Sequence, residues 1–252
     1  MAEQQAAPTA AQAFETEKKV AMAAMGQAQD LRALTRAWFD LSCRHRYSYN
    51  FTWLGRPIIQ FPQDIVALQE IVWKVKPDLI VETGIAHGGS LILSASLLHL
   101  LGGDSAVVGI DVDIRQHNRI EIEAHPLANR ITMIQGSSID EGVVQQVRDH
   151  ARGKQCVLVI LDSNHTHEHV SRELELYAPL VTKNSYLIVF DTIIEQMPDD
   201  AFTDRPWGKG NNPLTAVHGF LKTTDRFEID QEMNDKLLIT VAPDGYLRCI
   251  KD

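Results

Sequence analysis

The chain has 252 residues, with 24 Lys and Arg against 33 Asp and Glu, so its formal net charge at pH 7 is −9. It is long enough to bury a core of its own, and 44% apolar and 23% charged residues are typical of soluble globular proteins. The acidic balance disfavours binding to nucleic acid or to anionic lipid. Three isolated cysteines, apolar runs too short to span a membrane and no leader pattern after Met1 predict a cytoplasmic protein.

Residues 1–57 are expected to form an extension ahead of the main domain. Residues 16–36 would form a loose helix or stay disordered, and residues 31–41 have the apolar spacing of a helix. The aromatic and basic residues 44–53 fit either a loop with aromatic anchors or a lid over a substrate. The extension as a whole could serve as a lid or as an oligomer contact.

Residues 58–252 have the pattern of one α/β domain that begins with a helix at 62–75. Five apolar runs follow, at residues 79–81, 106–110, 131–134, 156–161 and 186–190. Between them, helices are expected at 89–101, from about 114, at 139–150 and at 165–177. This alternation predicts βαβ units, and hence a doubly wound, mostly parallel sheet. Residues 226–230 and 237–241 are too close for a helical crossover, which predicts an antiparallel strand pair at the end of the sheet.

Acidic residues or glycine follow each of the five expected strands. Ligands of doubly wound sheets bind at the carboxyl ends of the strands, so these exits are the candidate site. The exits, in chain order, are Glu82-Thr83-Gly84 with His87-Gly88-Gly89-Ser90, then Asp111, then Gly136-Ser137-Ser138, then Asp162 with His165, and then Asp191.

The glycine-rich loop after the first strand narrows the choice of cofactor. Gly84 and Gly89 have the spacing of a Walker A loop, but Ser90 stands where that loop needs lysine, which argues against an NTPase. The dinucleotide fingerprint is present only in degenerate form, so an NAD-dependent oxidoreductase remains an alternative. Glu82 would repel a pyrophosphate but suits the cationic amino acid of S-adenosylmethionine. Asp111 can accept both ribose hydroxyls of that cofactor.

Asp162 and Asp191 are expected to converge, because they leave neighbouring strands. Two such carboxylates suit a hard cation such as Mg²⁺, which lowers the pKa of a bound hydroxyl. His165, three residues after Asp162, is then the candidate general base. The alternative is a purely structural role, in which Asp162 caps a helix and His165 lies on the surface.

Two further segments have more than one interpretation. His165, Glu168 and His169 fit the literal HxxEH spacing of a zinc peptidase, but that motif needs a different architecture, and His167 with His169 fit solvated helix positions better. Residues 204–213 are expected to be a surface loop, or a loop that presents Trp207 and its asparagines to a polar acceptor such as a sugar. Pro213 would then begin a helix.

Several motifs in a fixed order resemble the cephalosporin hydroxylase / rhamnosyl O-methyltransferase family over residues 58–241. They are Val81-Glu82-Thr83-Gly84 with His87-Gly88-Gly89-Ser90, Gly109-Ile110-Asp111, Leu161-Asp162-Ser163-Asn164-His165, Val189-Phe190-Asp191-Thr192, and Pro206-Trp207-Gly208 with Gly210-Asn211 and Pro213. The chain is also similar to metal-dependent macrolide-sugar O-methyltransferases, whose Asp-x-x-His element matches Asp162 and His165.

The resemblance implies a class I, Rossmann-like S-adenosylmethionine-dependent O-methyltransferase with a small, polar and sugar-containing acceptor, often with Mg²⁺ and often a homo-oligomer. The expected cofactor residues are Glu82, Thr83, Gly84, His87, Gly88, Ser90, Asp111, Ser137 and Asp162. Asp162 and Asp191 are the expected metal ligands, and Asp162 and His165 the expected catalytic pair. Related sites often have two acids after the fifth strand, whereas this chain has Phe190 before Asp191, so Asn212, Glu195 or water would complete the metal site, or metal binding is weak.

Phe190 also leaves room for a non-catalytic, cofactor-binding partner of another biosynthetic enzyme. The family's historical name suggests hydroxylation, but the chain has no pair of histidines and a carboxylate at the spacing of a non-haem iron oxygenase.

Overall fold

The computed structural model describes residues 8–252, so the expectations for the first seven residues lie outside the described range. Its main sheet has seven strands in the spatial order β5-β4-β3-β6-β7-β9-β8. The strands are β3 (Leu79–Thr83), β4 (Ala106–Asp111), β5 (Ile131–Gln135), β6 (Val157–Leu161), β7 (Tyr186–Val189), β8 (Phe227–Ile229) and β9 (Tyr246–Cys249). The first five are parallel, and β9 runs antiparallel to both β7 and β8. The doubly wound, mostly parallel sheet with an antiparallel end is therefore confirmed.

The antiparallel pair contains one error of the sequence analysis. Residues 226–230 include β8, but residues 237–241 form no strand: they are the end of helix α9 and the turn after it. The partner of β8 is β9, further along the chain. The apolar run at 237–241 resembles a strand, but Leu237 is the last residue of a helix and is buried there, and Leu238 has a positive φ of 51°.

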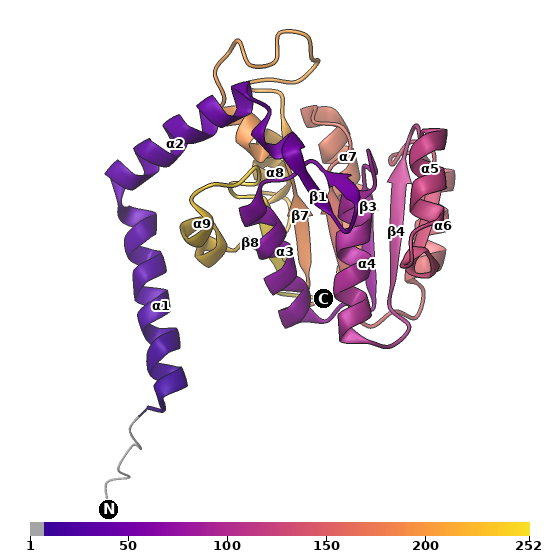
Figure 1. Ribbon diagram of the computed structural model, residues 1–252, viewed down its shortest axis with the longest axis horizontal. Helices are drawn as coiled ribbons and strands as arrows, with labels where there is room; N and C mark the ends of the chain where they lie inside the picture. Colours follow the sequence, from indigo (N-terminus) through magenta and orange to yellow (C-terminus); the bar gives the residue numbers. More distant parts are fainter. Residues whose placement is uncertain (1–7) are drawn as a thin grey trace, which may run out of the picture.

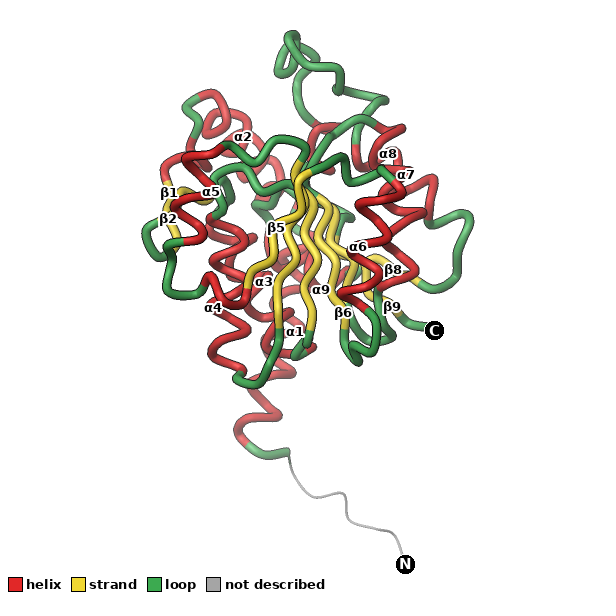
Figure 2. Tube along the Cα trace, turned by 90° about the vertical axis from the view of Figure 1, so that its right-hand side faces the viewer, coloured by secondary structure: helices red, strands yellow, loops and turns green. Residues whose placement is uncertain are grey.

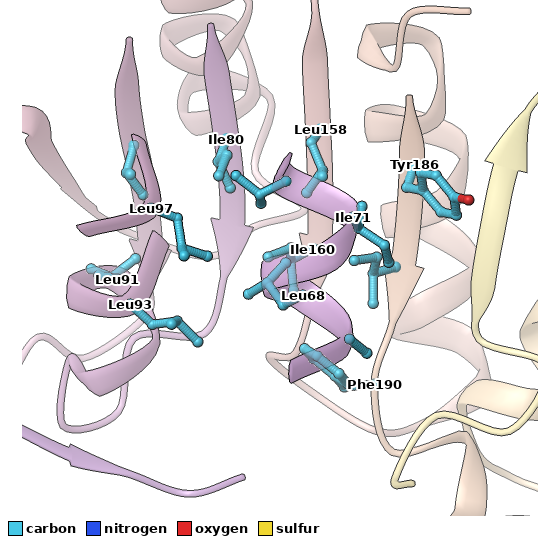
Figure 3. Packing of buried hydrophobic residues seen from close by; sticks show 14 of the residues in the cluster. Leu68, Ile71, Ile80, Leu91, Leu93, Leu97, Leu158, Ile160, Tyr186 and Phe190 are labelled. Atoms are coloured by element: carbon cyan, nitrogen blue, oxygen red, sulfur yellow. The ribbon is translucent and has the colours of Figure 1, made fainter. Parts of the chain in front are cut away.

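Helices cover both faces of the sheet (Figures 1 and 2). They are α3 (Pro62–Val75), α4 (Gly89–Leu101), α5 (Gln116–Glu123), α6 (Glu141–Ala151), α7 (His167–Tyr177), α8 (Pro213–Phe220) and α9 (Gln231–Leu237). One apolar cluster joins α3, α4, α5 and α9 to one face, and Leu68, Leu91, Ile80 and Ile160 are among its members (Figure 3). A second cluster joins α6, α7 and α8 to the other face.

The N-terminal segment forms an arm of two helices along one side of the domain (Figure 1). These are α1 (Ala10–Gln27) and α2 (Gln29–Arg44), which meet at Ala28, where ψ is 95°. The single helix expected at residues 16–36 is therefore interrupted, and the helix expected at 31–41 lies within α2. Arg32 pairs with Asp235 of α9 at 3.4 Å, so the arm contacts the body of the domain.

A short hairpin of β1 (Phe51–Trp53) and β2 (Arg56–Ile58) follows the arm. Within residues 8–252, four short 3₁₀ helices complete the elements, at Tyr47–Asn50, Ala128–Arg130, Ala178–Leu180 and Thr192–Gln196. Tyr47 packs its ring edge against Phe51 with centroids 5.0 Å apart, and Trp53 donates to Ser96 of α4 at 3.0 Å. Trp53, and Tyr47 through a contact with Phe61 at 5.7 Å between ring centroids, thus anchor this stretch to the domain, whereas Tyr49 is half exposed. Among the described residues, no helix has the length and apolar character that crossing a bilayer requires.

Candidate active site

The order of the strands fixes where the site lies. β3 has β4 on one side and β6 on the other. The chain adds β4 and β5 on one side of β3 and then crosses over to add β6 and β7 on the other side, so the topological switch point lies between β3 and β6. Thr83 and Leu161 are paired at the ends of these two strands. The residues that follow them, Gly84 and Asp162, are therefore placed next to each other by the sheet itself.

Gly84 is the point where the two loops touch. Its φ is +93°, and a Cβ atom there would collide with the carbonyl oxygen of Asp162. The backbone N–H of Asp162 in turn donates to the carbonyl of Thr83 at 2.9 Å. Glycine is needed here both for the left-handed backbone and for the close approach.

Glu82 is the last but one residue of β3 and is 1% exposed. Burial raises the pKa of its carboxyl group to about 7, although a hydrogen bond with Ser90 opposes the shift. Its Oε2 atom is buried without a hydrogen-bond partner anywhere in residues 8–252. A buried carboxylate with a free acceptor is poised to receive a cationic or hydrogen-bond-donating group.

Asp111 ends β4 and organises the glycine-rich loop. Its Oδ2 atom accepts from the backbone N–H groups of Ile85 and Ala86 at 2.8 and 3.2 Å, and its Oδ1 atom accepts from Asp113 at 3.0 Å. Each carboxylate oxygen has further lone pairs, so the same side chain can hold this loop and still accept from a ligand.

Two residues that support this loop were not singled out from the sequence. Arg56 donates to the carbonyl of His87 at 2.8 Å, and Asn118 donates to the carbonyl of Ala86 at 2.8 Å. Arg56 also donates to Asn118 at 3.0 Å. Arg56 lies in β2, ahead of α3 and β3, and Asn118 lies in the first turn of α5, so no pattern in the sequence associates them with the loop.

The remaining cofactor candidates lie around the same edge of the sheet. Gly88 caps α4 with a φ of +83°, and Ser90 lies in the first turn of that helix. A cavity of about 50 Å³ is lined by residues of both loops and of the segment before α3: Pro57, Ile58, Ile59, Gln60, Gly84, Ile85, Ala86, His87, Gly89, Ser90 and Asp162. Ser137 lies at the exit of β5, where its carbonyl accepts from Asp140, and it does not line this cavity.

Asp162, His165 and Asp191 converge on one point. Each offers one ligand atom, and these three atoms lie within 4.8 Å of one another. The Nε2 atom of His165 is 3.1 Å from an oxygen of Asp191. Burial, and then repulsion by Asp191 and Glu82, raise the pKa of Asp162 well above its usual range. Two carboxyl groups and an imidazole that converge in this way form a donor set that fits a divalent cation such as Mg²⁺ or Mn²⁺.

The residue before Asp191 points away from this cluster. Phe190 is 5% exposed and packs in the core with Leu68 and Ile160 (Figure 3). Its ring lies edge-on to Tyr246, with centroids 6.4 Å apart. Asp191 itself has a left-handed backbone with a φ of 57°, which turns the chain at the strand exit.

Glu195 and Asn212 hold a loop together and take no part in the cluster of three ligands. Glu195 accepts from the backbone N–H of Gly210 at 2.8 Å and from the Asn212 amide. The Asn212 side chain also caps α8, where Pro213 is the first residue. Through this clasp, loop 197–211 brings Trp207 edge-on against His165, with centroids 4.7 Å apart.

His165 lies in the turn before α7, not within the helix as expected, because α7 begins at His167. His165 therefore faces Asp191, whereas His169 faces Glu173 at 3.6 Å, and the two histidines do not form the zinc pair of an HxxEH motif. The expectation that His169 is solvated was wrong: its side chain is 18% exposed and hydrogen-bonded. His167 is exposed, and contacts Thr215 at 2.8 Å.

Comparisons with known proteins identify the family of this chain and agree with its sheet. The family Rhamnosyl O-methyltransferase/CmcI matches residues 45–250. The Rhamnosyl O-methyltransferase of Mycobacterium tuberculosis is 28% identical over 203 residues, which are 78% of this chain and 77% of that protein.

Solved structures extend the likeness to the fold. An apo-structure of CmcI has 23% identity and a TM-score of 0.60, covering 81% of this chain and 78% of that one. A CmcI structure with Mg-SAM has 21% identity and a TM-score of 0.57 over the same shares. The class I, Rossmann-like fold is thereby confirmed, and so is the expected class of enzyme, an S-adenosylmethionine-dependent O-methyltransferase. The chain belongs to the Rhamnosyl O-methyltransferase/CmcI family.

Proposed function

We propose that this protein transfers the methyl group of S-adenosylmethionine to a hydroxyl of a small, sugar-containing molecule, with a divalent cation and with His165 as the general base. The observation that carries the proposal is the convergence of Asp162, His165 and Asp191 beside the Gly84 loop. Donor loop and ligand cluster adjoin through the backbone contact of Gly84 with Asp162.

The donor side would be held by the exits of β3, β4 and β5. Glu82 would receive the ammonium group of the methionine part, because its buried carboxylate has an oxygen without a partner in the described part of the chain. Asp111 would accept from the ribose hydroxyls. Thr83, Gly84, His87, Gly88 and Ser90 would line the donor pocket, Ser137 would close its far end, and Asp162 would border both donor and acceptor.

The acceptor side would be built from Asp162, His165 and Asp191. The two carboxylates would hold the cation, whose charge lowers the pKa of an acceptor hydroxyl. His165 would then take the hydroxyl proton at Nδ1, while Asp191, 3.1 Å from Nε2 on the opposite side of the ring, would orient the imidazole and stabilise the imidazolium that forms. Because methyl transfer is an in-line displacement, most of the rate would come from positioning.

A polar, glycosidic acceptor is supported by what surrounds the cluster. Trp207 gives one aromatic wall against His165, and aromatic rings stack on the apolar faces of sugars. The names of the mycobacterial relatives refer to rhamnosyl groups, so rhamnosides are the first acceptors to test. With Glu195 and Asn212 engaged in the loop, the rest of the coordination shell would be water.

The test is a methyl-transfer assay with isotopically labelled S-adenosylmethionine and a panel of rhamnosides and other glycosides, with and without EDTA. Transfer to a glycosidic hydroxyl that EDTA abolishes and Mg²⁺ restores is the expected result. No detectable binding of S-adenosylmethionine at millimolar concentration would refute the proposal. Binding of the cofactor without transfer to any acceptor, together with co-purification of another enzyme, would instead favour a non-catalytic partner, for which Phe190 is the supporting observation.

A further inference from the structure

His169 and Glu173 occupy one face of α7, one turn apart, and both turn toward the sheet. Glu173 is fully buried, among the apolar residues Val170, Leu174 and Tyr177 of the same helix. Burying a carboxylate costs free energy unless its oxygens are hydrogen-bonded. An apolar residue at position 173 would pack in this environment without that cost, so packing alone does not explain a glutamate here.

The partners of this pair come from two strand exits. Ser163, which follows Asp162, donates its hydroxyl proton to Glu173 at 2.7 Å. The Nε2 atom of His169 lies 3.3 Å from the Ser163 hydroxyl and 3.0 Å from the Ser138 hydroxyl, at the exit of β5. Oε2 of Glu173 has no hydrogen-bond partner within residues 8–252.

The geometry of this network differs from that of a catalytic triad. Ser163 has one proton, which it donates to Glu173. In a hydrolytic triad the serine and the acid would face opposite nitrogens of the ring, whereas here both face Nε2, so Ser163 is not an activated nucleophile.

What the network does hold is the peptide between Asp162 and Ser163. On one side, the backbone of Gly84 touches the carbonyl of Asp162. On the other side, the Ser163 hydroxyl is hydrogen-bonded to Glu173 and lies in contact with His169. The backbone at this junction is therefore clamped from both faces of the loop, which fixes the direction in which the Asp162 carboxylate leaves the chain.

We infer that Glu173 and His169 are positioning residues, which orient Asp162 for cation binding through the hydroxyl of Ser163. The inference rests on the proposed function, since it concerns the carboxylate that would hold the cation. Groups that orient metal ligands affect metal affinity although they do not touch the ion.

The experiment is a titration of the purified protein with Mn²⁺, followed by electron paramagnetic resonance, in the wild type and in Glu173→Leu, Glu173→Gln and Glu175→Leu. Glu173→Leu removes the acceptor of Ser163 and should weaken Mn²⁺ binding by about 10- to 100-fold. Glu173→Gln keeps an acceptor oxygen and places an amide at the unpartnered oxygen, so it should retain most of the affinity. Glu175→Leu makes the same exchange at an exposed position of α7 and should bind Mn²⁺ as the wild type does.

Thermal unfolding separates positioning from a merely structural role. We expect Glu173→Leu to stay folded with an unfolding temperature near that of the wild type. The substitution removes both carboxylate oxygens from an apolar environment, which offsets the loss of the hydrogen bond. Should it fail to fold, Ser163→Ala breaks the same connection by removing one oxygen and should show the same loss of Mn²⁺ affinity. Folded Glu173→Leu or Ser163→Ala with wild-type affinity would overturn the inference and leave the proposed function standing. A wild type that binds neither Mn²⁺ nor S-adenosylmethionine would overturn both.

Discussion

The Nε2 atom of His165 lies 3.1 Å from Oδ2 of Asp191, across the gap between the loop after β6 and the loop after β7. Neither loop could place the imidazole alone, because His165 precedes the first residue of α7 and so lacks the support of a helix. Asp191 on one side and the edge of Trp207 on the other restrict the ring to one orientation.

Replacing the ring should remove proton transfer without removing the cofactor. His165→Ala is expected to lower kcat by about 10²- to 10⁴-fold, the usual contribution of a general base. Calorimetry should find S-adenosylmethionine binding unchanged, since His165 does not line the cavity beside the glycine-rich loop. His150→Ala, at an exposed position of α6, is the matched control. Turnover near that of the wild type would rule out His165 as the base.

Glu82 should release a proton when the cofactor binds. Burial raises the pKa of its carboxyl group to about 7, so near pH 7 a substantial fraction is protonated, and a cationic ammonium beside it would favour the ionised form. Calorimetric enthalpies measured at pH 7 in buffers of different ionisation enthalpy should therefore reveal proton release. In Glu82→Gln this dependence on the buffer should vanish. Equal proton release in both proteins would refute the assignment.

The same group should make the apo protein less stable as the pH rises. Its carboxyl ionises near 4.5 in the unfolded chain but near 7 in the fold, so stability declines between these values and stays lower above them, by about 3 kcal/mol for a shift of this size. Asp64, with a pKa of about 6 by burial, acts in the same direction. Denaturant unfolding of Glu82→Gln across this range should show a shallower decline, and the difference between the two proteins isolates Glu82.

Asp162 should trade stability for cation binding. Burial and repulsion by Asp191 raise its pKa well above the usual range, so its ionised form opposes folding in the absence of a cation. In EDTA, Asp162→Asn is expected to unfold at a higher temperature than the wild type. Saturating Mg²⁺ should raise the unfolding temperature of the wild type by mass action and leave that of Asp162→Asn unchanged. A lower unfolding temperature of Asp162→Asn in EDTA would contradict this account.

A pair of glycines can test the contact between the two loops. Gly153 and Gly84 both have a positive φ, but a Cβ at Gly153 meets nothing, whereas at Gly84 it meets the carbonyl of Asp162. Gly153→Ala should lower the free energy of unfolding by about 1–2 kcal/mol, the cost of a left-handed residue. Gly84→Ala should cost clearly more and should weaken S-adenosylmethionine binding, as measured by urea unfolding and calorimetry. Equal costs at the two positions would show that the contact is unimportant.

The sheet was predictable because its evidence is local. Each buried parallel strand is a continuous apolar run, and each helix between two strands has its own spacing, so the architecture could be read without long-range information. The failure at residues 237–241 has the same origin: a short apolar run is compatible with a helix end as well as with a strand. The division of the chain at residue 57 stays a prediction.

The site was predictable only in part. Strand exits share one edge of the sheet, so the convergence of Asp162 and Asp191 follows from the topology. Support from distant segments has no such pattern: Arg56 reaches His87 from a hairpin, and Glu173 reaches Ser163 from a helix face that otherwise looks like core. The roles of the site residues therefore stay predictions, as does a homo-oligomeric state.

The clasp made by Glu195 and Asn212 has a consequence for how acceptor choice could diversify. Both ends of loop 197–211 are pinned by side chains that lie outside the ligand cluster and outside the donor pocket. Apart from Trp207, which contacts His165, the intervening residues can thus change in length and chemistry while the catalytic geometry stays intact. Grafting this segment from a family member with another acceptor, between the same two anchors and with Trp207 kept, should transfer substrate preference while leaving cofactor affinity unchanged.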